Sequence, residues 1–496
     1  MNSPFAPGGA LNPQTLKQEW FGNLVGDVLS GLVVAVALIP EAIGFSMVIG
    51  VDPMVGLYAS FCIAIVTAFL GGRTGMISAA TGSMAMVMVL LVRDYGIEYM
   101  FAATIMCGVF QILLGAFKVG NLLRFIPRPV SIGFVNALAI MIFESQLGYF
   151  EGADWTLYVM VAVGIAAMFL WPKVTTKIPA GLVVIVAFTA CTIGFGWNVL
   201  TVGDLGNITG ELPSLHFPLV PLTFETLTII TPYALSLAIV GLSESLMTAQ
   251  LIDERVDNKS NKNRECVAQG VANIVAALFG GQAGCAMIGQ SMINISGGGR
   301  GRLSTFIAGF VLLILVLVLA PFVRQIPAAA LIAIMVVVSF NTFDWKSIPR
   351  IMHVDKGDTV VMVATVAVVL ITSNLAYGVV LGIAISAIVF ANKASQRNFH
   401  IYAEAEGDTL TFYTSGQLFF ASTERFLETF DMRRFKDSFH ENVVFDLTDM
   451  VICDESAVDA IDKAVTKFRE SGAKVEIVGM SEQKEAFYTK MSRVWG

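Results

Sequence analysis

The chain has 496 residues with a formal net charge of −7, and 55% of them are hydrophobic while only 14% are charged. Ordinary soluble domains carry about 25% charged residues, so a water-soluble fold could not hide this much apolar surface. The six cysteines show neither paired nor metal-ligand spacing, which excludes a disulfide framework and a zinc site from the expected architecture.

Residues 1–23 lack the basic start, apolar middle and cleavage site of a signal peptide, so we expect them to form a cytoplasmic N-terminal segment. Apolar stretches that can cross a hydrocarbon core of about 30 Å as helices then recur throughout residues 24–396. We therefore predict an all-α polytopic membrane domain with fourteen spans, at 24–49, 54–71, 77–92, 99–118, 130–149, 155–171, 178–199, 228–251, 267–280, 284–296, 304–323, 327–340, 359–373 and 376–392.

The positions of the basic residues orient these spans. With a cytoplasmic N-terminus, the inside segments hold eighteen Lys and Arg residues, whereas the outside segments hold only Arg93 and Arg324. The long outside segment 201–230 has no Lys or Arg at all. Because cytoplasmic loops are rich in Lys and Arg, we expect both termini to be cytoplasmic and the chain to lie in the lipid bilayer of a bacterial inner membrane.

An internal repeat relates the two halves of the membrane domain. Glu41 in LIPEAIGFS and Glu244 in GLSESLMTA interrupt the first and eighth spans, 244 − 41 = 203 residues apart. The glycine-broken stretches AATGSMAM and AGCAMIGQ interrupt the third and tenth spans, and Gly82 and Gly284 are 284 − 82 = 202 residues apart. A seven-plus-seven repeat has inverted halves, whose broken helices meet near the membrane midplane and form a substrate site.

The broken helices predict an anion site. A helix that begins inside the membrane has unpaired N–H groups and about +0.5 charge at its N-terminus, so two such ends attract an anion. The alternative is that these small residues only allow close helix packing. The residues expected to contact the anion, as hydroxyl donors or as small residues that let it approach the backbone, are Thr81, Gly82, Ser83, Gly284, Cys285 and Ala286.

The two buried glutamates predict coupling to a cation. Glu244 and Thr248 are one helical turn apart and share a face, which favours a small oxygen-lined site for H⁺ or Na⁺, and we assign Glu41 to proton sensing or to the lining of the site. Two helix ends contribute about +1 and two ionised glutamates −2, so an anion is repelled unless a cation accompanies it. The alternative is that both glutamates are protonated or hydrogen-bonded and only structural.

These residues resemble those of the sulfate permease (SulP) family, which includes bacterial relatives of the animal anion exchangers pendrin and prestin. The resemblance is most specific in GDVLSGLVVAVALIPEAIGFSMVIGVDPMVGLYASF (26–61), GGRTGMISAATGSMAM (71–86), IPRPVSIGF (126–134) and NISGGGRGRLS (294–304). It implies a core domain of spans 1–4 and 8–11, a gate domain of spans 5–7 and 12–14, elevator-like movement of one against the other, and a homodimer.

The resemblance also implies roles for individual residues. Thr81 lies in the TGSM segment, which is similar to the family's third-span anion site, and Phe45 is similar to the first-span aromatic residue that lines the pocket. Glu244 and Thr248 resemble the eighth-span acidic residue and threonine that hold Na⁺ in sodium-coupled bicarbonate members.

Two positions depart from the common pattern of the family. Glu41 stands where many relatives have glutamine, and bacterial members with glutamate there resemble proton-coupled carriers. Many relatives carry an arginine early in the tenth span, whereas CAMIGQSMIN has none and Gln290 stands near its place. Without that fixed positive charge, symport is favoured over electroneutral exchange.

Residues 397–496 form a separate cytoplasmic domain that alternates strands and helices. Strands are expected at 409–416, 442–449 and 473–479, and helices at 422–430 and 455–471, which predicts a small sheet with helices packed on it. The segment resembles the STAS domain, and Ser456 in ICDESAVDAI lies near the position that is phosphorylated in anti-sigma antagonists. The alternative is that Asp454 or Ser456 only caps the following helix.

We therefore expect a secondary transporter that takes up bicarbonate or a similar small oxyanion such as sulfate together with Na⁺ or H⁺. The alternatives are a proton-coupled C4-dicarboxylate symporter, a nucleobase permease and a membrane scaffold that does not transport. No nucleotide-binding or catalytic constellation is visible, so we expect no enzyme activity, no cofactor and no nucleic-acid partner. A cytoplasmic regulator of the C-terminal domain is a further expected partner.

Overall fold

The protein is described by a computed structural model, which forms two compact units, Met1–Ile383 and Ala384–Gly496. We call them the membrane unit and the C-terminal unit and treat each by itself. Helix α17 (Leu375–Arg397) runs across the division, and the C-terminal sheet begins at Phe399. The residues that the structure describes are 13–118, 120, 127–175, 179–206, 208, 210–256, 258–351, 355–397, 399–430 and 441–492.

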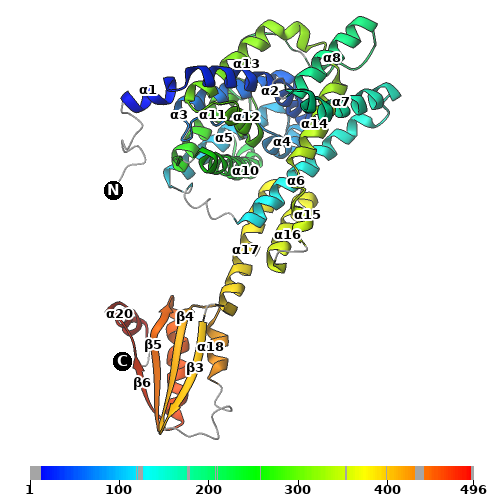
Figure 1. Cartoon of the computed structure of the whole chain (residues 1–496). Coiled ribbons are helices and arrows are strands. Elements are labelled where there is room, and N and C mark those ends of the chain that lie inside the picture. The colour runs from blue at the N-terminus through cyan, green and yellow to red at the C-terminus, as the bar shows by residue number, and fades with distance from the viewer. Residues whose placement is uncertain are drawn as a thin grey trace. The chain divides into compact units, whose positions relative to one another are not determined.

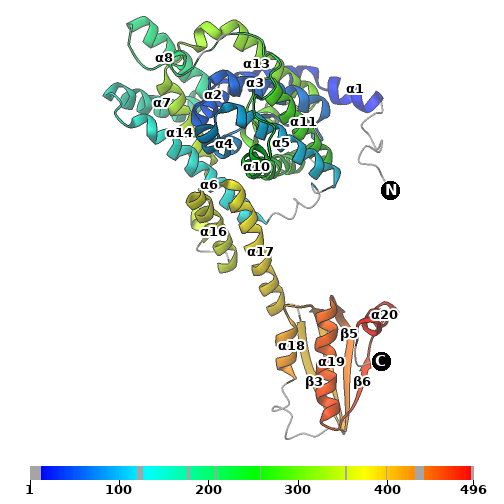
Figure 2. The same cartoon turned by 180° about the vertical axis from the view of Figure 1, so that it is seen from behind.

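The membrane unit consists almost entirely of helices (Figures 1 and 2). The predicted N-terminal segment contains α1 (Pro13–Phe21). The helices that follow are α2 (Leu24–Ile49), α3 (Pro53–Leu70), α4 (Gly82–Tyr95), α5 (Ile97–Ala116), α6 (Arg128–Leu147), α7 (Trp155–Val174), α8 (Ala180–Phe195), α9 (Val202–Leu205), α10 (Phe224–Val256), α11 (Lys262–Leu278), α12 (Ile288–Ser296), α13 (Arg302–Val323), α14 (Ala328–Thr342), α15 (Ser347–Ile351) and α16 (Lys356–Thr372), with a short 3₁₀ helix at Gly148–Phe150.

Each of the fourteen predicted spans coincides with one of these helices. Within the described residues, nine helices are long and apolar enough to cross a membrane, and α8 is a shorter apolar helix. The helices α4 and α12 are short because part of each predicted span is an extended strand instead. The fold is therefore the predicted helical membrane architecture, while the number of fourteen crossings stays a prediction.

Local sequence explains how the first two spans are separated. Gly50 ends α2 in the left-handed conformation, with φ of 81°, which glycine adopts without steric cost. Asp52 then caps α3 by accepting a hydrogen bond of 2.9 Å from the Met54 N–H. Pro53 occupies the first position of α3, where its missing N–H would have no partner in any case. The sequence Gly-Val-Asp-Pro thus forces a tight reversal between two spans.

The helices of the membrane unit pack in two groups. Helices α2–α5 lie with α10–α13, and α6–α8 lie with α14 and α16 (Figures 1 and 2). Small residues permit close contact in the first group. A Cβ at Gly108 of α5 would lie 2.5 Å from the carbonyl oxygen of Gly270 in α11, and the reverse distance is the same. This packing of small residues is typical of membrane helices.

The two halves of the first group repeat the same order of elements. The helix pair α2 and α3 is followed by strand β1 (Ser78–Ala80), α4 and α5, while α10 and α11 are followed by strand β2 (Gly284–Ala286), α12 and α13. Strands β1 and β2 pair antiparallel. The two copies therefore run in opposite directions where they meet, as the predicted inverted repeat requires.

Within the described residues after α17, the C-terminal unit contains a four-stranded sheet in the order β3-β4-β5-β6 and three helices. Strands β3 and β4 pair antiparallel, whereas β4 with β5 and β5 with β6 are parallel. The core between sheet and helices contains Phe412, Phe445 and Phe468, all buried. The elements are β3 (Phe399–Glu406), β4 (Thr409–Leu418), α18 (Thr423–Thr429), β5 (Asn442–Ile452), α19 (Glu455–Glu470), β6 (Lys474–Val478) and α20 (Glu482–Met491).

Sequence reasoning found the central elements of this unit and missed its two outer ones. Strand β3 was not predicted because FHIYAEAE mixes polar and apolar residues, as an edge strand with one exposed face does. Helix α20 was not predicted because EQKEAFYTKM buries only Tyr488 completely. In both elements the spacing of apolar residues gives only a weak signal, because only one face of each element packs against the core.

Candidate functional site

The two predicted helix interruptions meet in space. Strand β1 leads into α4 and β2 leads into α12, and the two strands pair antiparallel with Ala79 opposite Cys285. Because the strands are antiparallel, α4 and α12 leave the pair in opposite directions, so the N-termini of both helices lie beside it. The predicted broken helices are therefore confirmed as two strand-and-helix segments that share one short ladder.

Buried side chains hold this ladder in place. Asn273 of α11 donates to the carbonyl of Gly284 at 3.1 Å and accepts from its N–H at 2.8 Å. The Ser245 hydroxyl accepts from the Ala286 N–H at 3.1 Å, and the Ser291 hydroxyl accepts from the Ile77 N–H at 2.9 Å. Unpaired backbone groups in a membrane cost several kcal/mol each, so these polar residues stabilise an extended backbone where a helix would otherwise be required.

The first turns of α4 and α12 present free backbone donors. Thr81 is the N-cap of α4 but its side chain does not cap the helix, and Met287 likewise leaves α12 uncapped. Within the described residues, the N–H groups of Gly82–Met84 and of Ile288–Gln290 have no acceptor. Each helix end carries about +0.5 charge, so the two ends together supply about one positive charge without a basic side chain.

A buried polar cluster joins the two broken segments to α10. The Ser83 hydroxyl and the Cys285 thiol both donate to the same carboxylate oxygen of Glu244, the thiol at 3.2 Å. The Thr81 hydroxyl lies 3.1 Å from the Cys285 sulfur. Thr81, Ser83 and Cys285 are all buried. The structure therefore brings four of the predicted site residues together, although they lie up to about two hundred positions apart in the chain.

Thr248 stands beside this cluster on the same helix as Glu244. Its hydroxyl donates to the Glu244 carbonyl at 2.8 Å and lies 3.5 Å from the carbonyl oxygen of Ala286. The predicted neighbours Glu244 and Thr248 thus share a face of α10 and meet β2. Within the described residues, no group of three or more His, Cys, Asp or Glu side chains could hold a metal ion.

Glu41 and Phe45 of α2 lie against the same broken segments. The side chain of Gln290 in α12 lies near the Glu41 carboxyl group. Phe45 is buried, and a Cβ built on Gly82 would lie 2.8 Å from its ring and 3.0 Å from the Cδ1 atom of Ile142 in α6. Gly82 is therefore closed in by an aromatic residue from one helix group and an aliphatic residue from the other.

The structure corrects the alignment of the two repeats. Strands β1 and β2 begin 284 − 78 = 206 residues apart, and α4 and α12 begin 288 − 82 = 206 residues apart. The predicted pairing of Gly82 with Gly284 used an offset of 202. Gly284 is therefore a strand residue opposite Ala80 and not the start of a helix. It remains in the site because it lies next to the backbone of Ala79, where a Cβ would be 2.1 Å from the carbonyl oxygen.

Sequence reasoning missed the residues that support the ladder. Asn273 and Gln111 hydrogen-bond to each other at 2.9 Å and are completely buried. The sequence feature that could have indicated them is a polar amide side chain inside each of two apolar spans. Polar side chains are rare inside membranes and usually have a hydrogen-bond partner there. Their partner could not be named without the fold.

The predicted regulatory serine lies at the start of α19 in the C-terminal unit. Asp454 is the N-cap, and its carboxylate accepts from the Ala457 N–H at 3.0 Å and from the Phe420 N–H at 2.8 Å. Ser456 is exposed one position inside the helix. The capping role therefore belongs to Asp454, and the regulatory role of Ser456 stays a prediction.

Comparison with known families agrees with this fold. The model of the sulfate permease family matches residues 24–161 and 153–365, and the model of the STAS domain matches residues 400–491. Together these matches cover most of the chain. A membrane unit with paired broken helices, joined to a small α/β unit, defines a multi-pass transporter and not an enzyme. The chain belongs to the sulfate permease family and carries a C-terminal STAS domain.

Individual relatives are similar over nearly the whole chain. The putative sulfate transporter YbaR of Bacillus subtilis is 51% identical over 486 residues, which are 97% of this chain and 100% of that protein. The bicarbonate transporter BicA of Picosynechococcus sp. is 26% identical over 517 residues, covering 93% and 90% of the two chains.

Solved structures show the same fold. The transmembrane domain of a cyanobacterial bicarbonate transporter, BicA, aligns with a TM-score of 0.65 and 26% identity over 74% of this chain and 98% of that one. The anion transporter SLC26A9 aligns with a TM-score of 0.79 over 95% and 86% of the two chains, and at 18% identity this likeness concerns the fold alone.

Proposed function

We propose that this protein is a secondary active transporter that takes up a small oxyanion, bicarbonate or sulfate, together with H⁺ or Na⁺. The observation that carries the proposal is the position of Glu244. Its carboxylate accepts hydrogen bonds from Ser83 at the start of one broken helix and from Cys285 in the strand that leads to the other. A change in the charge of Glu244 therefore acts directly on the donors that surround the anion site.

Charge balance explains why a cation should accompany the anion. The two helix ends supply about +1 in total, whereas Glu41 and Glu244 supply −2 when both are ionised. Within the described residues neither glutamate forms an ion pair with a basic side chain. An ionised carboxylate in a membrane interior is costly without such a partner, so binding of H⁺ or Na⁺ removes both the penalty and the repulsion of the anion.

The contacts of Glu244 favour a proton over Na⁺. Its nearest polar side-chain atoms are a hydroxyl oxygen and a thiol sulfur, and hard cations prefer oxygen ligands. A proton needs only one oxygen of Glu244, and its arrival releases Ser83 and Cys285 to donate to the substrate. The Na⁺ site at Glu244 and Thr248 is the second candidate.

The names of the relatives guide the choice of substrate. YbaR is named as a putative sulfate transporter and BicA as a bicarbonate transporter. With both glutamates neutral, the two helix ends leave a charge of about +1, which matches the single charge of bicarbonate, whereas the second charge of sulfate requires one more cation. C4-dicarboxylate uptake with H⁺ is the runner-up. Elevator movement of the α2–α5 and α10–α13 group, a homodimer and cytoplasmic termini belong to the same proposal.

Uptake into proteoliposomes tests the proposal. Bicarbonate, sulfate, chloride and fumarate are supplied in turn under an imposed pH gradient, an imposed Na⁺ gradient or neither. We expect uptake of one oxyanion to follow the pH gradient in the wild type and to lose that dependence in Glu244→Gln. Glu144→Gln is the matched control because Glu144 is an exposed residue of α6.

Two results would refute the coupling scheme. Uptake by the wild type that ignores both gradients contradicts symport altogether. If Glu244→Gln retains the full pH dependence of uptake, Glu244 does not bind the coupling proton. The variant Glu41→Gln then tests the other buried carboxylate. Dependence on the Na⁺ gradient alone would replace the proton by Na⁺.

A further inference from the structure

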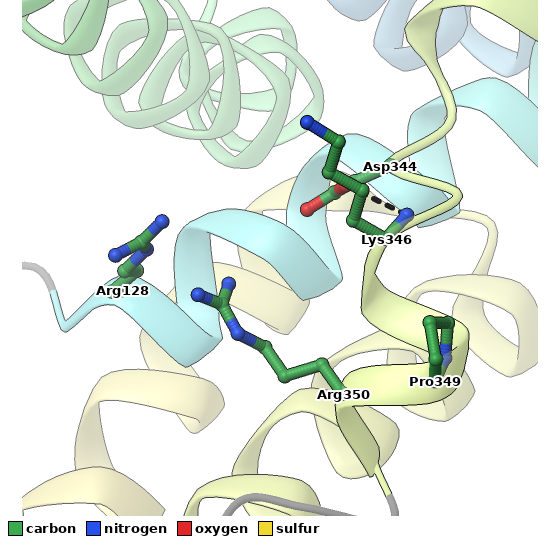
Figure 3. A pocket seen from close by; sticks show the side chains of 5 residues that line it. All are labelled: Arg128, Asp344, Lys346, Pro349 and Arg350. Atoms are coloured by element: carbon green, nitrogen blue, oxygen red, sulfur yellow. Dashed lines mark hydrogen bonds between the residues drawn. The ribbon is translucent and has the colours of Figure 1, made fainter.

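A second charged feature of the membrane unit lies away from the broken helices. Arg128 at the start of α6 and Lys346 and Arg350 near α15 line an open cavity of about 460 Å³, together with Asp344 and Pro349. Figure 3 shows the guanidinium group of Arg350 pointing toward Arg128, with the Lys346 side chain extending above Arg350. Two segments more than two hundred residues apart therefore combine their cations in one cavity.

The cavity carries an excess of positive charge. Among the described residues that line it, three are basic and one is acidic, so their balance is 3 − 1 = 2. In the part of the chain that the structure describes, Arg128, Lys346 and Arg350 form no ion pair. The Asp344 carboxylate accepts from the Lys346 backbone N–H at 3.1 Å. Two arginines that face the same space present paired donors for the oxygens of a phosphoryl group.

A smaller, mostly apolar cavity adjoins the basic one. Its volume is about 190 Å³, and it shares Arg128 and Arg350 with its neighbour. With the carboxylate of Asp358 included, the described residues that line the two cavities still carry one positive charge in excess. The remaining residues that line the smaller cavity are Pro129, Ile132, Ile351, Thr359 and Met362. The pair of cavities thus suits a ligand with an anionic group next to an apolar group.

The position of the two cavities along the membrane normal indicates which kind of ligand this is. Helix α6 begins at Arg128 and has 20 residues, which span about 30 Å, the thickness of a hydrocarbon core. Helix α14 ends at Thr342, just before Asp344. The basic cavity therefore lies where two spans reach the membrane surface, at the level of the phospholipid head groups.

We propose that the Arg128–Lys346–Arg350 cavity binds the phosphate group of an anionic phospholipid, with the glycerol and the first acyl methylenes in the adjoining apolar cavity. Basic pockets between membrane helices recognise anionic head groups in this way. The lipid joins the start of α6 to α15 and so connects two segments of the membrane unit. Lipid binding does not require transport, so this proposal is tested independently of the proposed function, although Arg128 also lines a cavity beside Ser243 and Met247 of α10.

The test uses the full-length protein purified in detergent and titrated with phosphatidylglycerol or phosphatidylcholine, with bound lipid counted by native mass spectrometry. We expect the wild type to prefer phosphatidylglycerol. Arg128→Gln or Arg350→Gln should weaken that binding roughly fivefold, and the double variant about 25-fold. Lys173→Gln is the matched control, because Lys173 is an exposed basic residue in the last turn of α7 and is not among the residues that line either cavity.

The remaining outcomes overturn the proposal. Equal binding of both lipids by the wild type, or an unchanged preference in the double variant, removes the assigned role of the cavity. A competition with glycerol 3-phosphate separates the two sources of a phosphate group. If this soluble compound displaces phosphatidylglycerol at comparable concentration, the apolar cavity contributes nothing and the site binds a free phosphorylated solute instead of a lipid.

Discussion

A single methyl group at Gly284 is expected to separate the two strands that join the broken helices. An ideal Cβ on Gly284 lies 2.1 Å from the carbonyl oxygen of Ala79 and 2.6 Å from the Cδ1 atom of Ile63. The isoleucine side chain can rotate away. The Ala79 oxygen belongs to the backbone of β1 and cannot move away by a side-chain rotation. The substitution Gly284→Ala must therefore push β1 and β2 apart.

The size of the effect follows from these distances. Contacts to a Cβ shorter than 3.0 Å essentially never occur, so the strands must separate by 3.0 − 2.1 = 0.9 Å. Ladder hydrogen bonds of about 2.9 Å would lengthen to about 3.8 Å, beyond hydrogen-bonding distance. Overpacking of this kind costs about 1–3 kcal/mol, or roughly a five- to 150-fold loss in the population of paired strands.

Substrate uptake and thermal unfolding measured on the same preparations test this reasoning. We expect Gly284→Ala to reduce uptake at least fivefold and to lower the midpoint of thermal unfolding. Gly194→Ala is the control, because a Cβ at Gly194 of α8 meets no atom within 4 Å and should leave both quantities unchanged. Wild-type uptake and an unchanged midpoint in Gly284→Ala would refute the close approach of the strands.

Three further predictions concern other buried polar groups. Asn273→Leu leaves the N–H and carbonyl of Gly284 without partners, so it should destabilise the fold by about 1–3 kcal/mol and reduce uptake, and wild-type uptake would contradict this role. Asp454→Ala removes the cap of α19 and should lower the free energy of unfolding of the C-terminal unit by about 1–2 kcal/mol. Limited proteolysis should then cleave this unit faster, and an unchanged cleavage rate would contradict the capping role. Burial and the hydrogen bond to Asp462 raise the pKa of Tyr488 well above its ordinary value, so the folded state holds this proton more tightly and stability should fall as the pH rises above about 10. Thermal unfolding between about pH 8 and 11 should show that decline in the wild type and a weaker one in Tyr488→Phe, and equal slopes would refute the assignment.

Much of the architecture could be predicted because a membrane span is a local property of the chain. The first span was expected at 24–49 and α2 is Leu24–Ile49, because an apolar run that must satisfy its own backbone hydrogen bonds has few alternatives to a helix. The repeated glutamates and glycine-broken stretches also identified both broken helices, since breaks in apolar spans are visible in sequence.

The register of the broken segments could not be predicted. Gly284 was aligned with Gly82, four residues from its structural equivalent, because a three-residue strand has no periodicity to set the alignment. The C-terminal unit shows the same limit. Its central strand β5 was expected, whereas β3 was missed because its polar face is typical of a loop as well as of an edge strand.

The sequence by itself therefore determined the membrane class, the repeat and the residues Ser83, Glu244 and Cys285 as candidates for one site. Only the tertiary structure decided that the hydroxyl and the thiol donate to the same carboxylate oxygen, that Asn273 holds the strand of Gly284, and that cations from α6 and α15 share one cavity. The physical reason is that apolar periodicity is a short-range signal, whereas a hydrogen bond between residues about two hundred positions apart depends on how whole helices pack.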